Sequence, residues 1–289
     1  MVMLTRNIFE KSTKMHAGVW DKSATNSYEI RGKKIGLVGY GSIGKRHLRV
    51  ARRIFPEATI AVLRRAEAKE IPEFADRCFK SINEAIEFAP QIAVICSPAT
   101  EHVNISSKLI ESKANILIEK PISDNVKGVS ELLIKAQKYG VKVAVGYNLR
   151  FNKSLNKFKE LIDSGIIGEV LSVRVEIGQY LPSWRPGTDY RSCVSSQKKL
   201  GGGVLNELSH EIDYVRWIFG EVRSVQAEIG KVSNLEIDVE DTVSLILKLN
   251  RKNDNKPLIV TMNMDFIRHD TTRNCQAIGS NGTLKWNAI

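Results

Sequence analysis

The stretch Lys34-Ile-Gly-Leu-Val-Gly39-Tyr-Gly41-Ser-Ile-Gly44-Lys45 joins a short apolar run to three spaced glycines and then to a helical pattern. The apolar run is typical of a buried parallel strand, and the residues that follow are typical of a helix. We expect Gly39 to permit a tight turn, Gly41 to let backbone N–H groups approach a pyrophosphate, and Gly44 to let the helix pack closely on the strand. Ser42 and Ile43 lie between these glycines, at the helix N-terminus that would hold the phosphate charge. The stretch therefore predicts a dinucleotide site.

The composition is that of a globular protein, with 43% hydrophobic and 26% charged residues among 289. This length allows one large domain or two of ordinary size. The net charge of +11 would suit nucleic acid, a membrane surface or anionic small molecules. Basic residues are scattered over helical faces, and no basic motif is interleaved with aromatic residues, so we expect small anionic ligands and no nucleic acid.

Targeting signals and metal motifs are not apparent in the sequence. No apolar run approaches the ~20 residues that a membrane helix needs, and the first thirty residues carry charges where a signal peptide has an apolar core. The four cysteines (Cys78, Cys96, Cys193 and Cys275) form no CxxC pair and have no nearby histidine at metal-ligand spacing. We expect a cytoplasmic protein with reduced thiols, no metal and no membrane contact.

The second predicted strand, residues 59–63, ends in Arg64 and Arg65, with no acidic residue before Glu67. In dinucleotide folds a carboxylate at this place accepts hydrogen bonds from the 2′-hydroxyl of the ribose, whereas arginine accommodates a 2′-phosphate. The two arginines favour NADP, with NAD as the alternative. The other interpretation is that they only end a strand in solvent.

Two further predicted strands, residues 91–96 and 115–118, carry polar residues at their carboxyl ends, where ligands bind in open α/β sheets. The first is followed by Ser97, Pro98 and, four residues further, His102. His102 is either a pocket residue or an ordinary histidine in the first turn of a helix. The second strand runs into Glu119-Lys120-Pro121, and Lys120 is a candidate acid or hydrogen-bond donor to a reacting oxygen.

The pattern changes after residue 147, where period-2 strands at 170–179, 222–231, 242–249, 258–265 and 274–279 predict a mostly antiparallel sheet. One strong helix, residues 204–219, interrupts them after a run of three glycines. Asn206, Glu207 and His210 would share one face of this helix, because residues three and four apart are neighbours. An amide or carboxylate there can orient the histidine, although His210 could equally be an ordinary half-buried residue.

These observations predict an α/β protein, with a Rossmann-type parallel-sheet domain followed by an α+β domain that has an open, mostly antiparallel sheet. The predicted parts are an N-terminal extension of atypical composition at 1–32, an NAD(P)-binding domain at 33–147, and a domain for substrate and oligomer contacts at 148–289. Such a sheet could pair copies of the chain in a homo-oligomer.

Five segments, GLVGYGSIG, AVICSPATEH, ILIEKP, the segment around Arg150 and GGGVLNELSHEIDYVRW, follow one another in this order. Together they resemble the Gfo/Idh/MocA family of nicotinamide-dependent oxidoreductases, over about residues 34–289. The resemblance implies reversible oxidation of a sugar, polyol or nucleotide-sugar hydroxyl. It also implies that Lys120 contacts the reacting oxygen and that His210 accepts the proton, while the cofactor carries the hydride. Ser97, Pro98, His102 and Glu119 would belong to the cofactor site.

The chain departs from the family pattern in three places. Asn206 stands where the family often has an aspartate, and the neighbouring Glu207 could supply the carboxylate in a shifted register. The chain ends at Ile289, where the family usually continues, so we expect a short C-terminus. Residues 4–44 resemble instead the segment that leads into the nucleotide domain of D-2-hydroxyacid dehydrogenases of the phosphoglycerate type, and the glycine turn is where the two resemblances meet.

Arg150 and the loop 181–191 are the predicted substrate contacts. Trp184 could stack on a sugar, and Arg185 could meet a phosphate or carboxylate; Tyr190 belongs to the same loop. The alternative is an exposed loop that uses Trp184 as a packing anchor. Two other functions stay open at this point: a dinucleotide-binding protein without turnover, and a 2-hydroxyacid dehydrogenase, which rests on the N-terminal segment alone.

Overall fold

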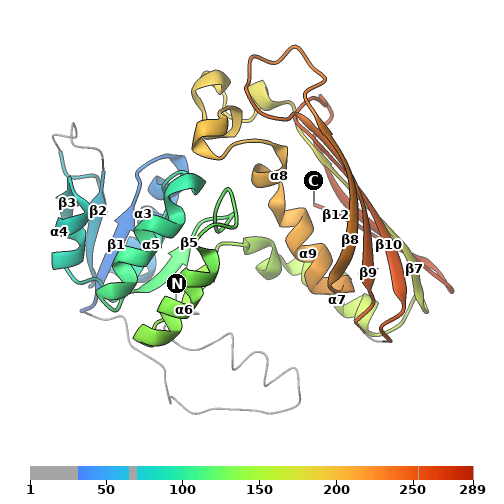
Figure 1. Ribbon diagram of the computed structural model, residues 1–289, viewed down its shortest axis with the longest axis horizontal. Helices are drawn as coiled ribbons and strands as arrows, with labels where there is room; N and C mark the ends of the chain where they lie inside the picture. The colour runs from blue at the N-terminus through green and yellow to red at the C-terminus, as the bar shows by residue number, and fades with distance from the viewer. Residues whose placement is uncertain (1–31, 65–69, 253, 289) are drawn as a thin grey trace. The chain divides into compact units, whose positions relative to one another are not determined.

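The computed structural model describes residues 32–64, 70–252 and 254–288 of the chain. These residues form two compact units, one that ends at Gly146 and one that begins at Tyr147 (Figure 1). The predicted N-terminal extension, apart from its last residue, and Arg65 lie outside the described residues. Among the described helices, none combines the length and the apolar character that crossing a bilayer requires.

The first unit is built on a six-stranded parallel sheet in the order β3-β2-β1-β4-β5-β6. This is the strand order of dinucleotide-binding folds, and the direction of winding reverses between β1 and β4. The predicted Rossmann-type sheet is confirmed. Its strands are β1 (Lys34–Val38), β2 (Thr59–Leu63), β3 (Arg77–Phe79), β4 (Ile92–Ile95), β5 (Asn115–Ile118) and β6 (Val143–Val145).

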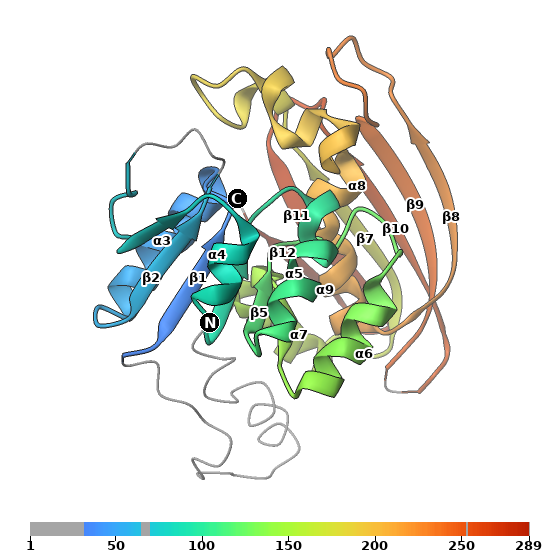
Figure 2. The same cartoon turned by 60° about the vertical axis from the view of Figure 1, so that its left-hand side comes forward.

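Helices cover both faces of this sheet. On one face α3 (Ser42–Ile54) packs through Leu48 and Ala51. On the other lie α4 (Ile82–Glu87), α5 (His102–Glu111) and α6 (Val129–Tyr139), and α5 and α6 run beside each other in both views (Figures 1 and 2). Ile43 is exposed, because it lies in the first turn of α3, ahead of the residues that reach the core.

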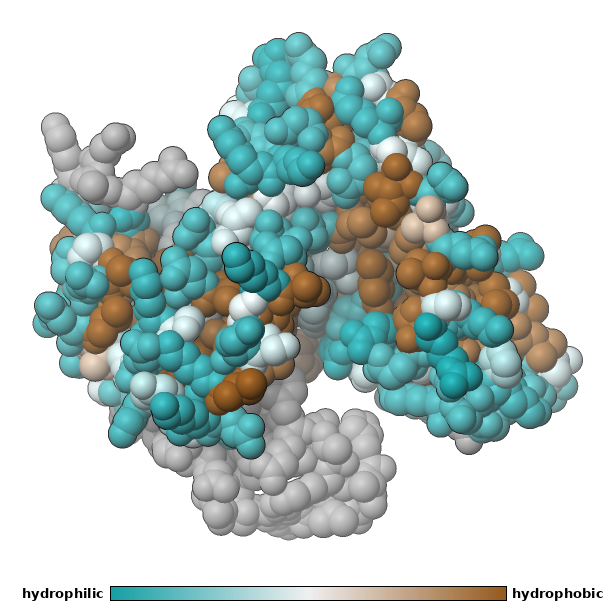
Figure 3. Space-filling model, in the orientation of Figure 1, coloured by the Kyte–Doolittle hydropathy of each residue, from teal (hydrophilic) through white to brown (hydrophobic). Residues whose placement is uncertain are grey.

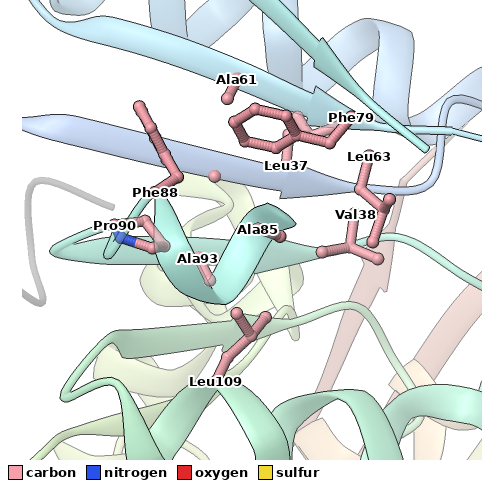
Figure 4. A pocket seen from close by; sticks show the side chains of 11 residues that line it. Leu37, Val38, Ala61, Leu63, Phe79, Ala85, Phe88, Pro90, Ala93 and Leu109 are labelled. Atoms are coloured by element: carbon pink, nitrogen blue, oxygen red, sulfur yellow. The ribbon is translucent and has the colours of Figure 1, made fainter. Parts of the chain in front are cut away.

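A small cavity lies inside the first unit, between the sheet and the helices α4 and α5 (Figure 4). Its eleven lining residues, among them Leu37, Phe79, Phe88 and Leu109, are all apolar. A ligand site needs a few polar groups that fix the orientation of the ligand. We therefore interpret this cavity as a gap in core packing.

The second unit contains a six-stranded mixed sheet in the order β12-β11-β7-β10-β9-β8. Only β10 and β7 pair in parallel, and the other four pairs are antiparallel, as predicted. The strands are β7 (Val170–Gly178), β8 (Val222–Gly230), β9 (Thr242–Asn250), β10 (Pro257–Asp265), β11 (Thr272–Gly279) and β12 (Thr283–Asn287).

Helices α7 (Lys153–Asp163), α8 (Val204–Glu207) and α9 (Ser209–Phe219) pack on one face of the second sheet and build its core (Figure 1). The other face is open, because residues on β9 and β10 alternate strictly between buried and exposed. Five short 3₁₀ turns complete the described part of this unit: Asn148–Phe151, Leu181–Ser183, Tyr190–Ser192, Val194–Ser196 and Lys198–Leu200. The open, mostly antiparallel sheet is thus confirmed.

The single helix predicted over 204–219 is wrong, because the structure divides it at Leu208. Leu208 has φ −101° and ψ 20°, which lies outside helical geometry. Its carbonyl accepts the N–H of Glu211, three residues further, where an α-helix would use the N–H four residues further. The Ser209 hydroxyl donates to the Asn206 carbonyl over 3.0 Å. The break places Asn206 and Glu207 on α8 and His210 on α9, so these three residues do not share one continuous helical face.

Candidate active site

The glycine turn has the geometry that its sequence predicts. Gly39 has φ +94°, and a Cβ added there would lie 2.6 Å from the Cys96 carbonyl oxygen. A Cβ on Gly44 would lie 2.2 Å from the Gly39 carbonyl oxygen, whereas a Cβ on Gly41 would meet nothing within 4 Å. Gly39 and Gly44 are therefore required by packing, and Gly41 leaves backbone accessible at the first turn of α3. Ser42 and Ile43 occupy that turn, where helix N–H groups attract anions.

The carboxyl end of β4, beside this turn, carries a polar atom without a partner. The Ser97 hydroxyl oxygen is buried and forms no hydrogen bond with the described residues. Such an orphaned group costs free energy unless a ligand or water satisfies it. Together with the accessible backbone at Gly41, at the point where the strand order reverses, these residues fit a bound dinucleotide. Pro98 follows Ser97 and precedes the 3₁₀ turn Ala99–Glu101.

His102 is held inside the first unit by two main-chain carbonyls. Its side chain is almost fully buried, with Nδ1 2.9 Å from the Pro121 carbonyl oxygen and Nε2 2.8 Å from the Ser97 carbonyl oxygen. Both ring nitrogens therefore face main-chain carbonyls of the same unit. The structure supports the alternative role, a histidine at the start of α5 that ties two loops together.

Glu119 and Lys120 follow β5 at the same edge of the sheet. The Glu119 carboxylate lies 2.6 Å from His47 Nε2 on α3, and its second oxygen accepts a 3.3 Å hydrogen bond from the Lys120 N–H. Burial pushes the pKa of Glu119 up, but the hydrogen bond and charge of His47 and the Lys120 N–H bring it below its ordinary value. Burial, followed by the Glu119 charge, raises the pKa of the Cys96 thiol at the end of β4. Lys120 itself is half-buried.

Arg64 lies at the end of β2, next to the glycine turn. Its guanidinium is 4.8 Å from the centre of the Tyr40 ring, and Lys45 Nζ is 5.4 Å from the same ring. Tyr40 stands between Gly39 and Gly41, so two cations gather beside the turn. Arg65 lies outside the described residues.

His210 is the second residue of α9 in the second unit. Its ring meets the Tyr147 ring edge to face, with centroids 5.6 Å apart. Asn206 turns its amide toward the glycine run and donates to the carbonyls of Gly201 and Gly202 over 3.1 and 3.3 Å. The Asn206 amide thus supports the glycine turn before α8, and Glu207 ends α8.

The glycine run itself is shaped by Glu240, from the segment before β9. A Cβ on Gly203 would lie 2.5 Å from a Glu240 carboxylate oxygen, and that carboxylate accepts the Leu205 N–H over 3.0 Å. Gly201 and Gly203 also have positive φ values. Glu240 therefore occupies the N-terminus of α8, which explains why glycine is needed there.

Arg150 is an ion-pair partner inside the second unit. Its Nε and Nη2 atoms donate to the two oxygens of Asp213 on α9 over 2.8 and 2.7 Å, and its guanidinium lies 5.9 Å from the Trp217 ring centre. The hydrogen bond with Asp213 raises the pKa of Arg150 despite partial burial. Arg150 was predicted as a substrate contact, and in the structure both of these nitrogens are held by Asp213.

Two sequence families match the chain. "Oxidoreductase family, NAD-binding Rossmann fold" matches residues 33–147, and "GFO/IDH/MocA C-terminal domain" matches residues 155–285. The chain belongs to the GFO/IDH/MocA oxidoreductase family. The predicted family resemblance is confirmed from Lys33 onward. The segment that resembles D-2-hydroxyacid dehydrogenases lies, up to residue 31, outside the described residues.

Curated relatives of this family member include two bacterial proteins. An uncharacterized oxidoreductase of Bacillus subtilis is 30% identical over 69% of this chain and 58% of its own length. Myo-inositol 2-dehydrogenase of Thermotoga maritima is 28% identical over 71% of this chain and 63% of its own. The chain thus spans about three fifths of the length of the curated relatives it matches.

Solved structures show the same fold. A dehydrogenase of Bordetella pertussis in complex with NADH and UDP-GlcNAcA superposes with a TM-score of 0.76 at 21% identity, over 89% of this chain and 74% of that one. Apo scyllo-inositol dehydrogenase of Lactobacillus casei has a TM-score of 0.71 at 20% identity, over 89% and 75%. At these identities the likeness concerns the fold.

The loop at 181–191 of this GFO/IDH/MocA protein, predicted to contact substrate, is anchored by two of its aromatic side chains. Trp184 packs edge to face on Phe266, with centroids 5.1 Å apart, and its Nε1 donates to the Gln179 carbonyl over 3.1 Å. The Tyr190 hydroxyl accepts the Glu236 N–H over 3.2 Å. Trp184 and Tyr190 thus anchor the loop, which is the alternative role for Trp184, and Arg185 is exposed.

Four residues that shape these sites are not indicated by the sequence: His47, Tyr147, Glu211 and Glu240. Their partners lie far along the chain, so no local pattern reveals them, although Tyr147 adjoins the Arg150 segment and Glu211 directly follows His210. Glu211 is completely buried and pairs with Arg273 Nε on β11 over 2.9 Å, which ties α9 to the sheet.

Proposed function

We propose that this protein is an NAD(P)-dependent oxidoreductase that oxidises or forms a hydroxyl of a sugar, polyol or nucleotide sugar. The observation that carries the proposal is the glycine turn at the reversal of strand order, with accessible backbone at Gly41 and the orphaned Ser97 hydroxyl beside it. The substrate class is supported by the names of relatives, which include inositol dehydrogenases and a glucose-6-phosphate 3-dehydrogenase.

In the proposed reaction Lys120 and His210 have different roles. Lys120 donates a hydrogen bond to the substrate hydroxyl oxygen and stabilises the negative charge that grows there. His210 accepts the hydroxyl proton during oxidation and returns it during reduction. When bound, the cofactor supplies hydride transfer at nicotinamide C4, so the carbon–hydrogen and oxygen–hydrogen bonds break as the carbonyl forms. Asn206 and Glu207 remain proposed members of the site.

We further propose that the cofactor is NADP, with NAD as the alternative. Arg64 and Lys45 supply two positive charges beside Tyr40, which would suit a 2′-phosphate. Arg64→Ala should therefore weaken NADPH binding roughly tenfold and leave NADH binding nearly unchanged. Equal affinity for the two cofactors, unaffected by Arg64→Ala, would defeat this part of the proposal.

The test of the function is a panel of polyols, sugar phosphates and nucleotide sugars, assayed with NAD⁺ and NADP⁺ in both directions. We expect turnover with at least one of them, measured as a change in reduced cofactor. A second candidate, a dinucleotide-binding protein without turnover, is favoured by the Asn206 amide, which faces glycine carbonyls. NADPH binding without turnover across the panel would support that candidate.

We propose the second sheet as a surface that pairs two copies of the chain. The edge strand β8 is exposed on both faces, and Val225 and Ile229 on it, with Ile246 on β9, are about half exposed. Apolar residues gather over these strands in Figure 3. Light scattering should give a dimer or larger assembly that Val225→Lys with Ile246→Lys dissociates. A wild-type monomer at high protein concentration would contradict this.

A further inference from the structure

His47 links two segments of the first unit that are far apart in sequence. It lies on α3, one turn beyond Gly44, and its Nε2 reaches Oε1 of Glu119 at the carboxyl end of β5 over 2.6 Å. The side chains are 24% and 16% exposed, so water screens the contact only partly. The contact connects the helix of the glycine turn to the residue that precedes Lys120.

The Glu119 carboxylate is confined on more than one side. Its second oxygen accepts the Lys120 N–H over 3.3 Å, and a Cβ on Gly146, just after β6, would lie 3.3 Å from its first oxygen. A short, partly buried contact of this kind holds a carboxylate in one orientation. Without His47, the Glu119 carboxylate would keep its hydrogen bond with the Lys120 N–H and lose its contact with the imidazole.

The main chain on the other side of Lys120 is also held. The Pro121 carbonyl oxygen lies 2.9 Å from Nδ1 of the buried His102. The residues before and after Lys120 are thus tied to two different helices, α3 and α5. Because His102 is almost fully buried and its replacement risks unfolding, His47 is the better position for an experiment.

We infer that His47 is a positioning residue for the cofactor site: it acts through Glu119 and fixes the end of β5 against the glycine-turn helix. This inference rests on the proposed function, because it assumes that a dinucleotide binds at the glycine turn. His47 itself does not need to touch the cofactor or the substrate. The site requires the hydrogen bond between residue 47 and Glu119. Another side-chain donor that reaches the Glu119 carboxylate should therefore substitute for His47.

The experiment compares NADH and NADPH dissociation constants of the full-length wild type, His47→Gln, His47→Ala and Gly146→Ala, measured by cofactor fluorescence. Glutamine places an amide nitrogen near the position of Nε2, whereas alanine removes the donor. Gly146→Ala crowds the same carboxylate, and Gly230→Ala, where a Cβ meets nothing within 4 Å, is the control. Circular dichroism confirms that each variant is folded at the assay temperature.

We expect His47→Ala to weaken binding roughly ten- to a hundredfold, Gly146→Ala to weaken it less, and His47→Gln to stay within about threefold of the wild type. A folded His47→Ala variant that binds as tightly as the wild type overturns the inference. So does His47→Gln binding as weakly as His47→Ala, since the hydrogen bond would then not be what matters. A wild type that binds neither dinucleotide overturns the proposed function, and this inference with it.

Discussion

Two hydrogen bonds, of 2.8 and 2.7 Å, join the Arg150 guanidinium to the Asp213 carboxylate and connect the start of the second unit to α9, the helix that carries His210. Asp213 is only 10% exposed, so Arg150 replaces much of the water that would otherwise solvate its carboxylate. Arg150, which was predicted to bind substrate, thus supports α9, the helix that carries the proposed proton acceptor.

Removal of this ion pair should destabilise the second unit. We expect Asp213→Ala to lower the free energy of unfolding by about 1–2 kcal/mol, because a charged hydrogen-bond partner is lost at a half-buried site. Lys157→Ala, which removes one side of the exposed pair Lys157–Glu160, should cost less than about 0.5 kcal/mol. Urea unfolding measures both values. Equal costs for the two variants would show that the Arg150 pair contributes no more than a surface pair.

The glycines of the turn should respond differently to alanine. Gly39→Ala should cost more than about 2 kcal/mol, because φ is +94° and the new Cβ meets the Cys96 carbonyl at 2.6 Å. Gly41→Ala should fold normally, since its Cβ has open space, but should weaken dinucleotide binding at least roughly tenfold by blocking close approach of the pyrophosphate. Thermal unfolding and cofactor titration separate the two effects. A Gly41→Ala variant that binds like the wild type would contradict the assignment.

Stability should fall in acid partly through Glu119. Its pKa in the folded protein is below its ordinary value of 4.5, so its contribution is present above that pH and is lost as the pH falls toward the lower folded pKa. The slope of unfolding free energy against pH below about 4.5 should therefore be smaller in Glu119→Gln than in the wild type. Urea titrations at a series of pH values test this, and identical slopes would refute it.

Asn206→Asp, which introduces the aspartate that the family resemblance leads one to expect, should harm the protein. The substitution replaces the amide that donates to the carbonyls of Gly201 and Gly202 with a carboxylate that faces two acceptors. We expect a loss of about 1–3 kcal/mol of stability and no gain in turnover. An aspartate variant that is as stable as the wild type and more active would show that the carboxylate can reach the reacting groups.

Structural features that depend on neighbouring residues in the sequence were predicted from local patterns. The turn Gly39-Tyr-Gly41, the strand alternation around Val173 and Val175, and Lys120 at a strand end are all visible in the sequence, because periodicity and glycine spacing report backbone geometry directly. The break at Leu208 was hidden, since the apolar pattern of 204–219 is continuous across it.

Partners distant in sequence could not be predicted. Glu240 shapes the glycine run from 35 residues beyond Leu205, and His47 reaches Glu119 from 72 residues before it. The role of Trp184 depended in the same way on Phe266, which only the folded unit brings beside it. The sequence therefore predicts candidate groups at the edge of the sheet, and the structure adds the residues that hold them in place.

The proposed chemistry is tested most directly by turnover and cofactor binding in Lys120→Ala and His210→Ala, each compared with the wild type on the best substrate of the panel. We predict that each variant loses turnover by roughly a hundredfold or more, since it removes the oxygen contact or the proton acceptor, while cofactor affinity stays within a few-fold of the wild type. Full turnover in both variants would contradict the proposed roles of Lys120 and His210.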